Sequence, residues 1–83
     1  MALQSVGIVG GGAWGTALAI TAHRAGRDVL IWAYEAQTVA DIKQKHRNEV
    51  YLPGITLDPA IEATARFNEV ANCDMLLMVT PAQ

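Results

Sequence analysis

The residues best placed to do chemistry in this sequence are glycines. Residues 6–15 read VGIVGGGAWG, and Gly10, Gly12 and Gly15 stand at the spacing GxGxxG. At that spacing the first glycine permits a sharp turn from a strand into a helix, the second lets backbone approach a pyrophosphate, and the third lets the helix pack against the sheet. The N–H groups at the start of the helix then attract the anion without a lysine or arginine. The pattern predicts dinucleotide binding, with a purely structural glycine turn as the alternative.

A carboxylate stands twenty residues beyond Gly15. Glu35 occupies the place where the ribose-binding acid of a dinucleotide site is expected, at the end of the second predicted strand. Its negative charge would repel a 2′-phosphate, so Glu35 favours NAD over NADP, although NADP stays open. The alternative is that Glu35 simply begins the next helix, where an acid is favourable.

The remaining chemically active side chains form no recognisable catalytic set. His23 and His46 have no partner carboxylate at a useful sequence spacing and are predicted to be surface or packing residues. Cys73 has no adjacent histidine to activate it, so a small buried residue is the preferred reading over a nucleophile. We therefore assign no catalytic residue and no metal ligand.

These groups must be positioned by alternating strands and helices. The predicted strands are residues 5–9, 28–33, 63–67 and 74–80, and the predicted helices are residues 13–24, 37–47 and a short one that Asn68 caps. Gly26 is placed to end the first helix, and residues 48–60 are predicted to be a loop that turns at Pro53-Gly54. The fourth strand is almost purely apolar and is predicted to be covered on both faces.

This order predicts an α/β fold, namely a partial doubly wound, Rossmann-like parallel sheet with strand order 3-2-1-4. In such a sheet the chain switches direction between the first and fourth strands, and ligands bind at that point. The glycine run lies between the same two strands.

Composition excludes several other classes of protein. The 83 residues have a formal net charge of −2, which offers no electrostatic surface for nucleic acid. No apolar run approaches the length of a membrane span, and the N-terminus does not resemble a signal peptide. With Cys73 as its single cysteine, the chain can form no internal disulfide. A cytoplasmic protein is therefore expected.

With these motifs in place, the chain resembles the N-terminal part of NAD(P)-dependent glycerol-3-phosphate dehydrogenases. Trp14 inside the glycine pattern is the most specific feature, together with the stretch NEVYLPG at residues 48–54; WAYE at 32–35 and VTPAQ at 79–83 are also similar. Two positions depart from the family pattern. Thr80 is inserted before Pro81, and Tyr34 replaces a basic residue that many bacterial members carry, which again argues for NAD.

The resemblance implies hydride transfer between a nicotinamide cofactor and the dihydroxyacetone phosphate/sn-glycerol 3-phosphate pair, within phospholipid biosynthesis and carbohydrate metabolism. It implies that residues 1–83 are the N-terminal part of a dinucleotide-binding domain, with the catalytic lysines, the remaining strands and a helical substrate domain downstream. The implied cofactor contacts are Gly10, Gly12, Ala13, Trp14 and Gly15 at the pyrophosphate, Tyr34 and Glu35 at the adenosine end, Tyr51 from the loop, and Pro81 near the nicotinamide half. A core-anchoring role for Tyr51 is the alternative.

Other functions also fit the sequence. A non-catalytic dinucleotide sensor or another Rossmann-fold dehydrogenase would share the glycine pattern, and a flavin site is a minor alternative. The expected partner is a small phosphorylated three-carbon substrate. A fourth strand without a further neighbour would expose an apolar edge, which is one route to a homo-oligomer. On its own, the chain is expected to bind cofactor weakly and to catalyse nothing.

Overall fold

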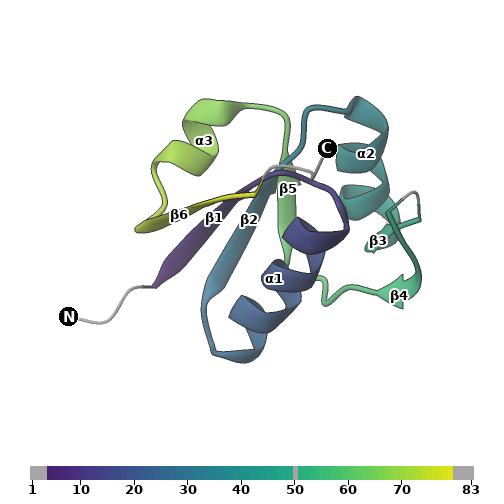
Figure 1. The fold of residues 1–83 in the computed structure, drawn as a ribbon, viewed down its shortest axis with the longest axis horizontal. Helices are drawn as coiled ribbons and strands as arrows, with labels where there is room; N and C mark the ends of the chain where they lie inside the picture. Colours follow the sequence, from purple (N-terminus) through teal and green to yellow (C-terminus); the bar gives the residue numbers. More distant parts are fainter. Residues whose placement is uncertain (1–3, 50, 80–83) are drawn as a thin grey trace.

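The chain forms a mixture of strands and helices in the computed structural model, which describes residues 4–49 and 51–79 (Figure 1). The elements are β1 (Ser5–Val9), α1 (Ala13–Arg24), β2 (Asp28–Trp32), α2 (Ala36–Lys45), β3 (Arg47–Asn48), β4 (Leu52–Thr56), β5 (Glu62–Thr64), α3 (Phe67–Ala71) and β6 (Met75–Met78). Among the described residues, no helix is both long enough and apolar enough to cross a bilayer.

Four strands form the parallel sheet, in the order β5-β2-β1-β6. At its centre Ile8 of β1 pairs with Ile31 of β2 on one side and with Leu77 of β6 on the other. Counted within this sheet alone, the strands lie third-second-first-fourth, so the predicted α/β class and strand order are confirmed. The element numbers differ from that count because β3 and β4 pair separately.

Helices cover both faces of the sheet, as Figure 1 shows for α1 and α3. Gly7 and Ile8 are neighbours on β1, so their side-chain positions point to opposite faces. A Cβ on Gly7 would strike the side chain of Val70 in α3, whereas a Cβ on Gly15 in α1 would lie 3.4 Å from Ile8. The core on the α1 and α2 side includes Ile8, Ile31 and Ile42, which are fully buried.

Helix α1 has the predicted bounds and the predicted end. The Gly26 N–H donates to the carbonyl of His23 at 2.9 Å, and the Arg27 N–H donates to the carbonyl of Ala22 at 3.2 Å. These two bonds are those of a Schellman motif, with Gly26 at its left-handed position. They close α1 immediately before β2 and so set where that strand begins.

The loop predicted over residues 48–60 is a β-hairpin in its first half. Strands β3 and β4 pair antiparallel, with Asn48 opposite Leu52, and Pro53 and Gly54 lie inside β4. The predicted turn at Pro53-Gly54 is therefore wrong. Proline is tolerated in an edge strand because its missing N–H removes no ladder bond there, and β4 has β3 as its partner on one side. Helix α2 also ends earlier than predicted, because His46 adopts a left-handed φ of 55°.

The chain leaves β5 sooner than predicted, and Asn68 is not a helix cap. Phe67 begins α3 instead, and its ring packs edge-on against Trp32 of β2 with 5.9 Å between ring centroids. That contact fixes the start of α3 one residue before Asn68, and Arg66 occupies the N-cap position.

Strand β6 is not covered on both faces, which corrects the expectation from its apolar sequence. Met75, Leu76 and Met78 are 40%, 38% and 67% exposed. The physical reason is its position at the edge of the sheet, where β1 is its neighbour on one side. The apolar edge expected for the fourth strand is therefore present within the described residues.

Candidate functional site

The glycine pattern forms the connection from β1 to α1, and two of its glycines are required by the fold. Gly10 has a φ of 135°, and its N–H donates to the carbonyl of Trp32 at 2.9 Å. A Cβ on Gly10 would collide with the carbonyl oxygen of Val79, and one on Gly15 would collide with the carbonyl oxygen of Gly10. These two positions let the start of α1 pack directly on the ends of β1 and β6.

Gly12 lies in open space instead. It is the N-cap of α1 with φ −76° and ψ −173°, which other residues also adopt, and a Cβ placed on it would meet nothing within 4 Å. The N–H groups of Ala13, Trp14 and Gly15 belong to the first turn of α1, where a helix has no carbonyls of its own to bond them. The turn thus presents free amide donors at the positive end of the helix dipole.

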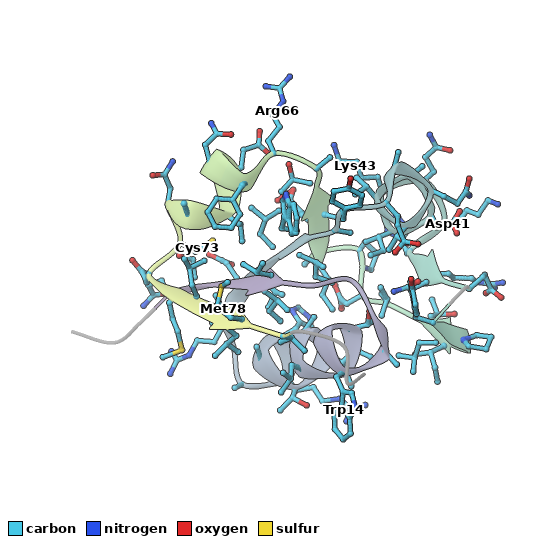
Figure 2. All side chains as sticks on the ribbon, turned by 45° about the horizontal axis from the view of Figure 1, so that its top comes forward. Trp14, Asp41, Lys43, Arg66, Cys73 and Met78 are labelled. Atoms are coloured by element: carbon cyan, nitrogen blue, oxygen red, sulfur yellow. The ribbon has the colours of Figure 1, made fainter. Side chains whose placement is uncertain are left out.

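Trp14 stands beside these donors with its ring in solvent. Its side chain is 75% exposed, and Figure 2 shows it projecting from α1 away from the rest of the molecule. The described residues therefore leave most of the ring uncovered. A contact of Trp14 with cofactor stays a prediction, and an exposed indole on the first helical turn is free to make one.

Asn48 is the member of this site that the sequence reasoning missed. It is fully buried at the end of β3, and its Nδ2 donates to the carbonyl oxygen of Gly11 at 2.7 Å and to Oγ1 of Thr16 at 2.8 Å. Oγ1 of Thr16 in turn donates to the carbonyl oxygen of Gly12 at 2.9 Å. Asn48 opens the stretch NEVYLPG, which indicates the family but does not show that this residue contacts the turn.

Glu35 follows the end of β2 by three residues, at the same edge of the sheet as the glycine turn. It is the N-cap of α2, yet its side chain makes no capping hydrogen bond. Oε1 of Glu35 instead accepts a hydrogen bond from the Tyr51 hydroxyl at 2.7 Å, and this bond raises the pKa of Tyr51. Glu35 thus begins α2, as the alternative interpretation predicted, but its carboxylate makes no hydrogen bond to the N-terminal amides of that helix.

Tyr34 and Tyr51 differ in how they are held. Tyr34 is 87% exposed, and its ring meets the edge of Trp32 with 6.5 Å between centroids. Tyr51 is less exposed and lies in the hairpin that also carries Asn48. The β3–β4 hairpin thus contacts both halves of the candidate site, the glycine turn through Asn48 and the end of β2 through Tyr51. The predicted position Pro81 lies outside the described residues.

The histidines and the cysteine lie apart from these contacts. His23, for which no partner was expected, has Nε2 3.2 Å from Oδ2 of Asp58. The two residues are far apart in sequence, so their spacing could not reveal the pair, which the fold makes by laying the segment after β4 against the end of α1. The backbone N–H of Ala60, and then His23, lower the pKa of Asp58. Burial raises the pKa of the Cys73 thiol, which argues against a nucleophile.

The arrangement can bind an extended ligand that carries an anionic centre and a hydroxyl-bearing end. Free amides at the start of α1 suit a pyrophosphate, and the Glu35 carboxylate at the end of the neighbouring strand suits ribose hydroxyls. Within residues 4–49 and 51–79, no group of three or more histidine, cysteine or acidic side chains gathers as a metal site would require.

The chain is similar to known proteins in sequence and in fold. The chain is 57% identical over 81 residues to the glycerol-3-phosphate dehydrogenase [NAD(P)+] of Paramagnetospirillum magneticum, covering 98% of this chain and 30% of that protein. It is 51% identical to the protein of the same name from Caulobacter vibrioides, covering 100% of this chain and 25% of that protein. The chain thus spans between a quarter and a third of the length of these curated relatives.

Solved structures of proteins with the same name share the fold of this chain. The crystal structure of glycerol-3-phosphate dehydrogenase from Coxiella burnetii superposes with a TM-score of 0.82 at 28% identity, covering 92% of this chain and 24% of that one. The glycerol-3-phosphate dehydrogenase of Plasmodium falciparum superposes with a TM-score of 0.79 at 28% identity, covering 93% of this chain and 24% of that one. Residues 5–83 also match the family described as NAD-dependent glycerol-3-phosphate dehydrogenase N-terminus. The chain belongs to that family, which its glycine turn and its NEVYLPG hairpin had indicated.

Proposed function

We propose that this chain is the NAD(P)-binding portion of a glycerol-3-phosphate dehydrogenase, which transfers hydride between a nicotinamide cofactor and the sn-glycerol 3-phosphate/dihydroxyacetone phosphate pair. The observation that carries the proposal is the open space and the free amides at Gly12, on a turn that Gly10 and Gly15 hold against the sheet. The names of the relatives supply glycerol 3-phosphate, and dihydroxyacetone phosphate is the ketone formed when its C2 hydroxyl is oxidised.

Each residue of the site has a binding role in this proposal. The N–H groups from Gly12 to Gly15 bind the pyrophosphate, and Trp14 covers it from the solvent side. Tyr34 and Glu35 bind the adenosine end, Tyr51 holds Glu35 in place, and Pro81 lies near the nicotinamide half. When bound, the cofactor donates or accepts the hydride. The residues described here bind and orient it, and they supply no group that moves a proton on the substrate.

The same contacts support a preference for NAD. A carboxylate accepts hydrogen bonds from the 2′- and 3′-hydroxyls of the ribose and repels a 2′-phosphate. Tyr34 has no positive charge to offer a phosphate. NADP is expected to bind, but more weakly.

The catalytic lysines and the site for the substrate phosphate are proposed to lie in the part of the protein beyond this chain. The isolated chain is then expected to bind cofactor weakly and to turn over no substrate. Its apolar β6 edge is expected to promote self-association when no further strand covers it.

The test is an assay of the protein that carries this chain, with NADH or NADPH and dihydroxyacetone phosphate, alongside the chain alone. We expect oxidation of NADH by the whole protein and none by the chain. Cofactor binding by a whole protein that reduces no dihydroxyacetone phosphate would favour a sensor or another dehydrogenase. Turnover by the isolated chain would refute the assignment of catalysis to other segments.

A further inference from the structure

We propose that Asn48 is a positioning residue for cofactor binding, because it fixes the peptide between Gly11 and Gly12 with its N–H facing the bound pyrophosphate. The inference deepens the proposed function and rests on it. Asn48 itself touches no cofactor in this proposal, since its side chain is fully buried behind the turn.

The hydrogen bonds around Asn48 allow one orientation of its amide. The carbonyl oxygen of Gly11 is purely an acceptor, so the atom 2.7 Å from it must be the donor Nδ2. Nδ2 donates its second hydrogen bond to Oγ1 of Thr16, and the Thr16 hydroxyl donates to the carbonyl oxygen of Gly12. The chain of donors therefore runs in one direction, from Asn48 to Thr16 to the turn.

Holding the Gly11 carbonyl also aims the next amide. The carbonyl of Gly11 and the N–H of Gly12 belong to one planar trans peptide, so they point to opposite sides. With Asn48 on the carbonyl side, the Gly12 N–H points away from the protein interior. Within the described residues it has no hydrogen-bond acceptor, and the space beside Gly12 is open. If the peptide rotated by half a turn, a carbonyl oxygen would face the anion instead.

The interior gains little else from an asparagine at this position. Oδ1 of Asn48 is buried and has no hydrogen-bond partner among the described residues, which is a cost to the folded state. Glycine at positions 11 and 12 leaves the peptide between them with wide conformational freedom, so a residue from outside the turn is needed to fix it. Asn48 comes from the hairpin and supplies that bond across 37 positions of sequence.

Asn48→Asp in the protein that carries this chain tests the proposal, because aspartate has the same shape and cannot donate to Gly11. We expect the affinity for NADH to fall about tenfold or more, as for the loss of a hydrogen bond to a charged group. The affinity for adenosine, which lacks the pyrophosphate, should stay within about twofold, because that end of the site is bound by other residues. Asn48→Leu, with the same branching at Cγ and also without a donor, serves as the second variant in case a buried carboxylate prevents folding.

Ile42→Val is the matched control for lost stability, since it removes one buried methylene from α2 and no hydrogen-bond donor to the turn. It should leave the affinities for both NADH and adenosine unchanged. Equal losses of NADH and adenosine affinity in the Asn48 variants would show a general structural role and overturn the proposal. Unchanged NADH affinity in both variants would overturn it as well. Failure of the unaltered protein to bind NADH would instead refute the proposed function from which the inference starts.

Discussion

The hydroxyl of Tyr51 donates a hydrogen bond to Oε1 of Glu35 at 2.7 Å, joining the β3–β4 hairpin to the end of β2. Within the described residues, the other carboxylate oxygen of Glu35 has no hydrogen-bond partner, so it is available to a ribose hydroxyl. The bond therefore does two things: it holds the carboxylate in one orientation, and it leaves half of its acceptor capacity for the ligand.

Tyr51→Phe is predicted to weaken NADH binding without unfolding the protein. Phenylalanine keeps the ring and removes the hydroxyl, so Glu35 loses its anchor but keeps its charge. The site is partly exposed, which limits the effect to about a two- to fivefold rise in the NADH dissociation constant. Fluorescence titration of the protein that carries this chain measures it.

A double-mutant cycle provides the control for Tyr51→Phe. In a Glu35→Ala background the tyrosine hydroxyl has no carboxylate to hold, so removing it should have no further effect on NADH affinity. An equal loss in both backgrounds would mean that Tyr51 acts through some contact other than Glu35.

Glu35→Gln is predicted to reduce the preference for NAD. The substitution removes the negative charge that opposes a 2′-phosphate while keeping an oxygen that accepts a hydrogen bond. The ratio of kcat/KM for NADH to that for NADPH should fall by about tenfold, mainly because NADPH improves. Glu62→Gln, which removes the same charge from the start of β5, should leave the ratio unaltered. A ratio that Glu35→Gln does not change would assign the preference to other residues.

Alanine substitutions at two glycines of the turn are predicted to have different effects, one on the stability of the fold and the other on NADH affinity. Gly15→Ala should destabilise the protein by about 1–3 kcal/mol, because the new Cβ collides with backbone that cannot move far. Gly12→Ala should change the free energy of unfolding by less than about 1 kcal/mol, since its Cβ meets open space and its φ suits alanine. Yet Gly12→Ala should weaken NADH binding by about tenfold or more, because the methyl group occupies the path of the pyrophosphate.

Urea unfolding and NADH titration of both glycine variants check this pair of outcomes. If the Gly12→Ala protein bound NADH as tightly as the unaltered protein, the ligand would not approach the turn at Gly12. The comparison is informative because the two substitutions are chemically identical and stand three residues apart.

The part of the fold that local sequence determines was predictable. Helix α1 was predicted to the residue, because a glycine turn precedes it and Gly26 supplies a complete Schellman ending. The structural roles of Gly10 and Gly15 also followed from the motif, which predicts a sharp strand-to-helix turn packed on the sheet, whereas the pyrophosphate role of Gly12 stays a prediction. The sheet order followed from the alternation of elements, because parallel crossovers leave few topologies.

The features that were missed depend on contacts between distant segments. Asn48 reaches Gly11 and Thr16 across more than thirty residues, and nothing local in NEVYLPG marks it as a donor to the turn. The hairpin places Pro53 inside a strand, where local propensity indicates a turn. The exposure of Trp14 and of β6 depends on which elements stand beside them, which their own apolar character cannot reveal.

Asp74, which immediately precedes β6, is predicted to make the stability of the protein depend on pH in the acidic range. Its Oδ2 accepts hydrogen bonds from the backbone N–H groups of Gln4 at 2.9 Å and Ser5 at 3.1 Å, while its own N–H donates to Oγ of Ser5 at 2.9 Å. The bonds from Gln4 and Ser5 lower the pKa of Asp74. They join the edge strand to β1 at the end of the sheet opposite the glycine turn.

The direction of the pH effect follows from that lowered pKa. The stabilisation is complete above the unfolded-state pKa of aspartate, about 3.9, and is lost as the pH falls through the lower folded-state value. Asp74→Asn should therefore lower the urea midpoint at pH 7, and the difference from the unaltered protein should shrink toward zero as the pH falls below about 3.9. Asp28→Asn, at the exposed start of β2, is the matched control and should shift the midpoint little at any pH. A deficit in Asp74→Asn that stays constant down to pH values well below about 3.9 would show that shape, and not charge, joins β6 to β1.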